Sequence, residues 1–120
     1  MNALHDSLVT ALAGLLILGS VLHMVGTWRQ IPHRSTEFVW SMGAALSGVQ
    51  IGFLHLLKIR RPEDASIALL ATGGALAWAA VAQAFGRAIG NRYDFRVIWH
   101  EVCAIGLALL ASTALIDALL

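Results

Sequence analysis

Residues 8–25, LVTALAGLLILGSVLHMV, form an apolar run without a charged side chain. A helix needs about 20 apolar residues to cross roughly 30 Å of hydrocarbon. Similar runs follow at about residues 38–57, 65–85 and 97–119. Because backbone N–H and C=O groups find no water partners in lipid, we expect all four runs to be helices. The sequence therefore predicts an integral membrane protein with four transmembrane helices.

The composition also indicates that a bilayer is the solvent of this chain. The 120 residues are 58% hydrophobic and only 12% charged, whereas a soluble domain carries about 25% charged residues. A small soluble domain needs polar side chains to cover its surface, and this sequence does not supply them. The net charge of +1 favours no nucleic-acid partner. Because short segments join the runs, we expect one all-α domain over residues 1–120, an antiparallel four-helix bundle with short loops.

Local signals indicate how the predicted helices begin and pack. Ser7 and Ser35 are expected to cap the first and second helices by accepting hydrogen bonds from free backbone N–H groups. Asp64 suits the positive N-terminal end of the third helix. Gly48 and Gly52 form a G-x-x-x-G step in the second helix, which lets helix backbones approach closely. We expect this step to serve packing within the bundle, with contact to a second copy as the alternative.

Topology gathers polar side chains at one end of the predicted bundle. The first helix ends, the second begins, the third ends and the fourth begins on the same membrane face. The other end is expected to carry few polar groups, with His55 at the membrane interface beside Lys58. We expect the polar end to form a pocket for a small lipophilic molecule, built from His23, Glu37, Trp40, Gln83, Arg87, Trp99, His100 and Glu101.

The cost of burying charge suggests a role for each of these residues. A charged side chain at the bilayer centre costs about 2.5–3.5 kcal/mol, and Glu101 lies a few residues inside the fourth span. We expect Glu101 to be protonated, or paired with Arg87 or a histidine. Glu101, Glu37 and His100 are the candidates for acid–base catalysis. The candidates for ligand binding are His23, Trp40, Gln83, Arg87 and Trp99.

The sequence offers one cofactor alternative. His23 and His100 lie at neighbouring helix ends and at similar depth, and could hold haem b as a bis-histidine pair, although no C-x-x-C-H attachment motif is present. We otherwise predict no cofactor. We predict no metal site either, because the adjacent His100 and Glu101 point about 100° apart on a helix. The single Cys103 excludes an internal disulfide.

Three short motifs between residues 36 and 101 carry a family resemblance. Glu37-Phe38 opens the second predicted helix, ahead of small residues at positions 43, 44 and 48. The segment GRAIG at 86–90 closes the third, and Glu101 lies early in the fourth. With these motifs the segment resembles uncharacterised four-helix bacterial membrane families grouped near the DoxX-like proteins. The resemblance implies a four-helix bundle with a polar end in the bacterial cytoplasmic (inner) membrane, and it implies no substrate.

Three functions fit this pattern. The first is binding of a small lipophilic molecule in the polar pocket, with acid–base chemistry of an isomerase, hydrolase or cyclase type. The second is an accessory subunit of a respiratory or photosynthetic membrane complex that holds quinone or haem. The third is a small dimeric transporter, although no charge lies at the midplane where transporter sites usually lie. Membrane lipids are partners in each case, a homodimer or larger complex is an alternative, and whether the chain is an enzyme stays open.

Overall fold

The computed structural model describes residues 3–120, except for the side chains at 114 and 117–119, and contains four α-helices and no strand within that range. The helices are α1 (Ala3–Gln30), α2 (Thr36–Arg60), α3 (Ala65–Ala88) and α4 (Phe95–Leu119). Each predicted span lies within one helix. All four helices are long and apolar enough to cross a membrane. The predicted all-α class with four helices is confirmed, and the helices suggest a multi-pass membrane protein.

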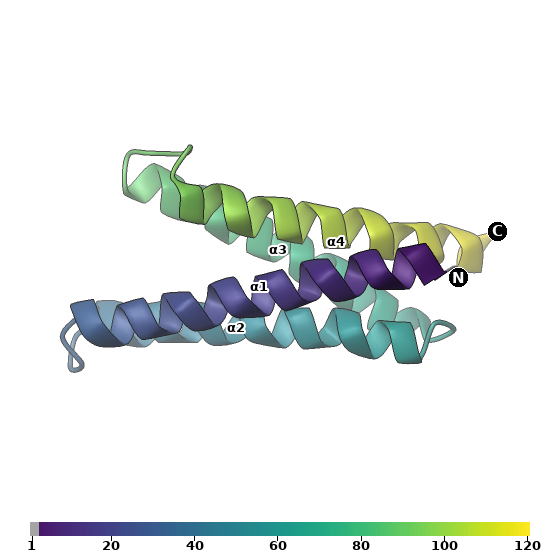
Figure 1. The fold of residues 1–120 in the computed structure, drawn as a ribbon, viewed down its shortest axis with the longest axis horizontal. Helices are drawn as coiled ribbons and strands as arrows, with labels where there is room; N and C mark the ends of the chain where they lie inside the picture. Colours follow the sequence, from purple (N-terminus) through teal and green to yellow (C-terminus); the bar gives the residue numbers. More distant parts are fainter. Residues whose placement is uncertain (1–2) are drawn as a thin grey trace.

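The helices form two antiparallel hairpins, α1–α2 and α3–α4, which lie side by side (Figure 1). The hairpins touch through α1 with α4 and through α2 with α3. Both chain ends and the connection at 61–64 lie at one end of the molecule, here called the terminal end. The connections at 31–35 and 89–94 lie at the other, the loop end. The hairpins diverge toward the loop end, where the sequence gathers its polar groups.

Side-chain caps fix the starts of three helices. Ser35 Oγ accepts a hydrogen bond from the backbone N–H of Phe38 at 3.1 Å, as predicted. Asp64 and Asp94 cap α3 and α4 in the same way. The prediction for Ser7 is wrong, because α1 already begins at Ala3 and the Ser7 hydroxyl donates to a carbonyl within the first turn. The apolar run marks only the membrane part of a helix that extends beyond it.

The core is built from small and medium side chains because the helices approach closely. A Cβ added to Gly52 would lie 2.5 Å from Ile17 Cγ1, and one added to Gly48 would collide with Ser20 Oγ. The G-x-x-x-G step of α2 therefore packs against α1 inside the bundle, as predicted. The central buried side chains are Val9, Ala13, Leu16, Ala75, Trp78, Cys103, Ala104, Leu107 and Ala108.

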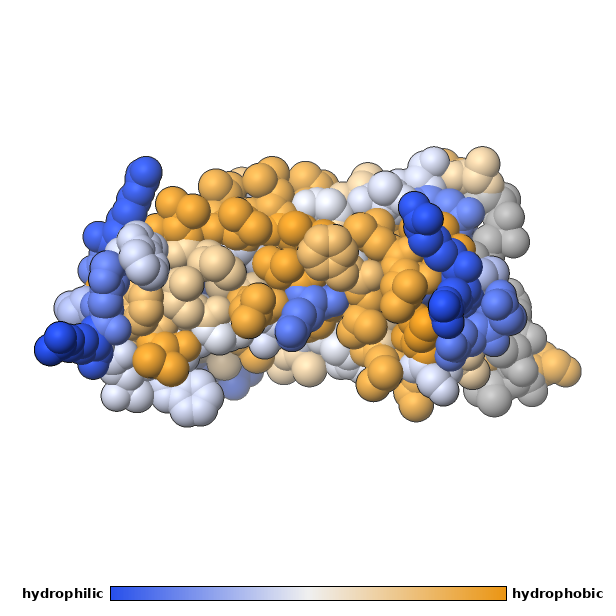
Figure 2. Space-filling view, turned by 90° about the horizontal axis from the view of Figure 1, so that it is seen from below, coloured by the Kyte–Doolittle hydropathy of each residue, from blue (hydrophilic) through white to orange (hydrophobic). Residues whose placement is uncertain are grey.

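The outer surface is apolar along the middle of the molecule. Figure 2 shows a hydrophobic belt between two hydrophilic ends. Leu69 of α3 and Leu109 of α4 are each 64% exposed. A soluble monomer rarely exposes an apolar patch larger than a few hundred Å². The belt is the surface expected of helices that face hydrocarbon.

Candidate functional site

A cleft of about 400 Å³ opens between the two hairpins at the loop end. Residues of α1 and α4 form most of its wall, and Ser41 of α2 and Phe85 of α3 complete it. A smaller pocket of about 80 Å³ lies on the side of α2 and α3. The side chains that line both spaces, and therefore lie between them, are His23, Phe85, Arg96 and His100.

The wall formed by α1 and α2 carries a chain of hydrogen bonds. His23 Nε2 lies 3.0 Å from Ser41 Oγ, and Ser41 Oγ lies 2.7 Å from Thr27 Oγ1. His23 and Thr27 are four residues apart, so they share one face of α1. Hydroxyl and imidazole groups can each donate or accept a hydrogen bond. This wall can therefore bind a ligand group that donates a hydrogen bond or one that accepts it.

His100 is oriented by Trp78 from α3. The Trp78 Nε1–H donates to His100 Nδ1 at 3.2 Å, and the two rings meet edge to face with centroids 5.6 Å apart. Because Nδ1 accepts this bond, the neutral imidazole carries its proton on Nε2. His100 lines the cleft, and its Nε2–H makes no hydrogen bond among the described residues, so this N–H is the group that His100 can donate to a ligand.

These hydrogen bonds do not fit a bis-histidine haem pair. A histidine that ligates a metal must present a free lone pair. In His100 one ring nitrogen accepts from Trp78 and the other carries the proton. In His23, Nε2 shares its hydrogen bond with Ser41. Haem b therefore stays a prediction from the sequence alone.

Arg96 lies at the mouth of the cleft, where Asp94 and Phe85 position its guanidinium group. Its Nε and Nη2 donate to the two carboxylate oxygens of Asp94 at 2.8 and 3.0 Å, and its Cζ lies 5.3 Å from the centroid of the Phe85 ring. Hydrogen bonds from the Arg96 side chain and backbone lower the pKa of Asp94 to about 2. The pair is thus charged at neutral pH. The remaining guanidinium N–H groups are free to bind a ligand oxygen.

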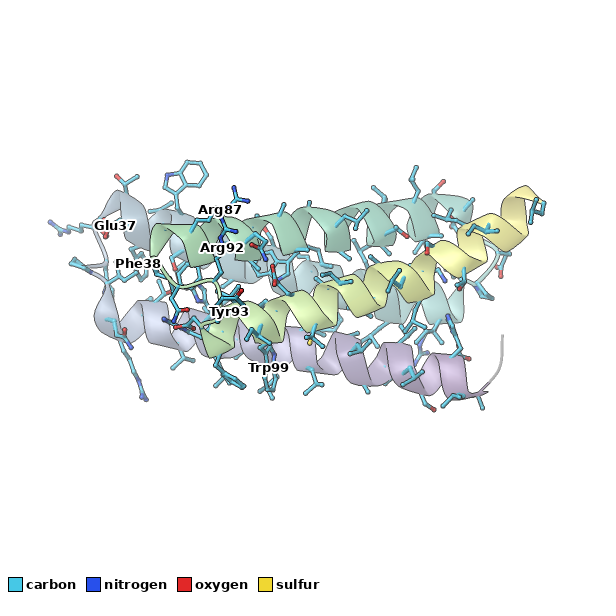
Figure 3. The ribbon with its side chains drawn as sticks, turned by 90° about the horizontal axis from the view of Figure 1, so that it is seen from above. Glu37, Phe38, Arg87, Arg92, Tyr93 and Trp99 are labelled. Atoms are coloured by element: carbon cyan, nitrogen blue, oxygen red, sulfur yellow. The ribbon has the colours of Figure 1, made fainter. Side chains whose placement is uncertain are left out.

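Trp99 forms the part of the wall where α4 meets α1 (Figure 3). Its indole Nε1–H donates to the Leu15 carbonyl oxygen at 2.9 Å. Gly19 makes room for this contact, since a Cβ there would lie 2.6 Å from Trp99 Nε1 and 3.2 Å from His100 Cε1. A glycine at this position therefore lets both α4 rings pack against α1.

Glu101 lies beside the cleft without lining it. The Gln83 Nε2 group donates a hydrogen bond to the Glu101 carboxyl group across the contact between α3 and α4. Both side chains are half-buried. Adjacent residues on a helix point about 100° apart, so the cleft receives His100 while Glu101 faces α3. The partner of Glu101 is thus an amide, whereas the sequence suggested that Glu101 is protonated or is paired with Arg87 or a histidine.

Three other expected site residues lie at the loop end but do not line the cleft. Glu37 and Arg87 are exposed at this end of the bundle (Figure 3), and Trp40 is 72% exposed. The structure therefore brings together His23, Trp99 and His100 in the cleft and places Gln83 with Glu101 next to it. Of the three residues expected to catalyse acid–base steps, only His100 lines the cleft.

Several cleft residues were missed by reasoning from the sequence. Thr27 could have been found from His23, because the two are one turn apart on one helix face. Trp78 lines the smaller pocket beside the cleft and also gave a signal, since an indole N–H within an apolar run needs an acceptor when it is buried. Ser41 and Phe85 gave none, because only the packing of the hairpins places them at the cleft.

At the terminal end, His55 and Lys58 are buried. His55 is 0% exposed, and its ring nitrogens make no well-aligned hydrogen bond among the described residues, although the Ala71 backbone lies close to the ring. Lys58 is 3% exposed, with Asp6 of α1 as a nearby opposite charge. The depth of His55 at the membrane interface stays a prediction; within the bundle, α3 closes over the residue and brings the Ala71 carbonyl to face its ring.

No family model, curated protein or solved structure matches this chain. The resemblance of residues 36–101 to the four-helix bacterial membrane families therefore stays a prediction. The function must be inferred from the cleft and the groups that line it.

Proposed function

We propose that this chain is a multi-pass membrane protein whose loop-end cleft binds a small lipophilic molecule with a head group that accepts hydrogen bonds. The hydrogen bond from Trp78 to His100 carries this proposal, because it makes the imidazole a donor within a cleft of about 400 Å³. Ligand pockets commonly enclose about 300–1,000 Å³. A carbonyl or carboxylate oxygen would accept from His100 or from Arg96 at the mouth.

The rest of the wall suits an apolar tail. Leu22, Phe85, Phe95 and Trp99 line the cleft together with two glycines of α1. Because the cleft lies mostly between α1 and α4, two helices that face the bilayer, a lipophilic molecule would enter sideways from the bilayer. The bacterial cytoplasmic membrane is the location that the family resemblance implies. A quinone, with its carbonyl oxygens and apolar tail, belongs to the proposed ligand class and would also suit an accessory subunit.

Binding is favoured over turnover and over passage across the bilayer. No carboxylate is among the described residues that line the cleft, so an acid–base step would fall to His23 or His100. Below the cleft, the buried side chains of Leu16, Ala104 and Leu107 pack between the helices. This packed layer separates the cleft from the terminal end and gives a bound molecule a floor.

The experiment is purification from native membranes in mild detergent, followed by native mass spectrometry and a visible spectrum. Gly26 lines the cleft, and a Cβ there meets nothing within 4 Å. Gly26→Leu should therefore fill the cleft without disturbing the fold, and the co-purifying lipophile should be lost. Gly14→Leu is the matched control, because Gly14 lies on the same helix outside the cleft and its Cβ is equally free.

A lipophile bound equally to the wild type and both variants would contradict the proposal, as would the absence of any ligand from the wild type. The head group is tested with a long-chain carboxylic acid and the corresponding alcohol as probes. A hydrogen bond to a charged group contributes about 1.5–3 kcal/mol. Arg96→Gln should therefore weaken binding of the acid about tenfold or more and leave binding of the alcohol nearly unchanged.

A further inference from the structure

The outward face of α2 carries a polar side chain without a partner in this chain. Gln50 is exposed and makes no hydrogen bond with any residue that the structure describes. It lies 14 residues after Thr36 and 10 before Arg60, the ends of α2, and therefore near the middle of the span. The face in Figure 2 shows a hydrophilic patch midway along the hydrophobic belt. In hydrocarbon an unpaired amide group costs several kcal/mol.

Gln50 differs from the exposed hydroxyl side chains within the spans. The exposed hydroxyls of Thr10 and Thr113 donate to carbonyls of their own helices at 2.7 and 2.8 Å. Ser47 does the same on α2 at 2.9 Å. A glutamine amide has two donors and an acceptor, and the structure leaves all of them unused. An outside partner is therefore needed at the depth of Gln50.

The surroundings of Gln50 have the pattern of a helix–helix seam. Exposed residues recur at alternating steps of three and four along α2, with Gln50 near the centre. This spacing brings two helices together over many turns, and one central polar residue fixes their register and the number of copies. Gly43 and Ser47, one turn apart on this face, would allow close approach. The seam consists of Val39, Gly43, Leu46, Gln50, Phe53 and Leu57.

The chemistry of the amide favours a second copy of this chain as the partner that packs against this face of α2. Under a twofold axis along the membrane normal, each Gln50 donates to the carbonyl oxygen of the other, so the contact is self-complementary. A different protein would have to present both a donor and an acceptor at this depth. The seam residues are exposed on the side of α2 opposite its buried positions Ala45 and Gly48, so pairing there does not cover α1 and α4, which form most of the cleft wall. We propose that two copies pair through the α2 seam with the Gln50 amides at its centre.

The test is the dimer dissociation constant of the full chain in liposomes, measured by energy transfer between labelled copies as the protein is diluted in lipid. Hydrogen bonds between membrane helices contribute about 0.6–1.7 kcal/mol, so Gln50→Leu should weaken the dimer about threefold to twentyfold. Leu46→Ala on the seam should also weaken it. Leu109→Ala on the outward face of α4 is the matched control and should leave the dissociation constant unchanged.

Disulfide trapping tests the geometry in a Cys103→Ala background, which removes the native thiol. Phe53→Cys, on the seam, should give a covalent dimer in the membrane, whereas Ile105→Cys, exposed on α4, should not. A monomer at every dilution would overturn the proposal. So would an equal response of the seam and α4 variants, or another protein trapped at position 53 in native membranes.

Discussion

The two ends of the bundle use histidine in opposite ways. At the loop end, His100 accepts a hydrogen bond from Trp78 and lines a cleft of about 400 Å³. At the terminal end, His55 is 0% exposed and its ring nitrogens make no well-aligned hydrogen bond among the described residues. The hairpins diverge at the first end and close at the second (Figure 1). A histidine in a helix bundle thus indicates a binding site only where the helices leave space beside it.

Glycines contribute to the difference between the closed end and the open end, because some of them face a packed neighbour and others face empty space. At Gly52, toward the terminal end, an added Cβ would lie 2.5 Å from Ile17 Cγ1 and 3.1 Å from the Ala13 carbonyl oxygen. At Gly26, toward the loop end, an added Cβ meets nothing within 4 Å. One glycine joins α2 to α1, and the other leaves room in the cleft. The same residue type therefore closes one end and opens the other.

The largest expected effect comes from enlarging these two glycines. Overpacking a core lowers the free energy of unfolding by about 1–3 kcal/mol. Gly52→Leu should lie at the upper end of this range, because the contact at Gly52 is already filled. Gly26→Leu should leave it unchanged or raise it slightly, since glycine is a poor helix former. Reversible unfolding in mixed micelles, followed by circular dichroism, measures both. Equal losses in the two variants would remove the distinction between a closed and an open end.

A smaller loss is expected from removing the acceptor at the loop end. His100→Leu leaves the Trp78 N–H without a partner, which should lower the free energy of unfolding by about 1–2 kcal/mol. The double variant His100→Leu with Trp78→Phe should recover part of this loss, because both polar partners are then gone. Unfolding followed by tryptophan fluorescence tests the pair. Strictly additive losses would show that the two side chains do not interact.

At the terminal end, replacing the histidine is expected to stabilise the protein. His55→Leu should raise the free energy of unfolding by about 1 kcal/mol, because it removes a buried polar ring whose nitrogens lack a well-aligned hydrogen bond. The Ala71 carbonyl that faces the ring lies within α3 and keeps its helical partner. The same unfolding measurement applies. A loss of stability in His55→Leu would show that the imidazole makes a stabilising hydrogen bond, as His100 does at the loop end.

The sequence was sufficient to predict the four helices and the end of the bundle at which the candidate site residues lie, but not their direction around each helix. Length and hydropathy place residues along the membrane normal, and this put His23 and His100 at the same end. Neighbouring positions then point about 100° apart. The expected residues Trp40 and Glu101 face away from the cleft, whereas the adjacent Ser41 and His100 line it. Only the packing of one hairpin on the other sets these rotations.

The smallest expected effect is a pH dependence at the mouth of the cleft. Hydrogen bonds from Arg96 lower the pKa of Asp94 from 3.8 to about 2. The folded state therefore binds fewer protons than the unfolded state, so the stabilisation is complete above pH 4 and is lost as the pH falls toward 2. The melting temperature should fall slightly over this window and stay constant between pH 5 and 7 as far as Asp94 is concerned.

Asp94→Asn is the control that isolates this carboxylate, because asparagine caps a helix about as well as aspartate. The variant keeps the start of α4 but has no carboxylate to protonate, so its melting temperature should change less between pH 4 and 2 than that of the wild type. Equal acid sensitivity in both proteins would show that the stabilising carboxylate lies away from the mouth. The contrast between the two ends would then rest on packing alone, without a contribution from the charged pair at the cleft.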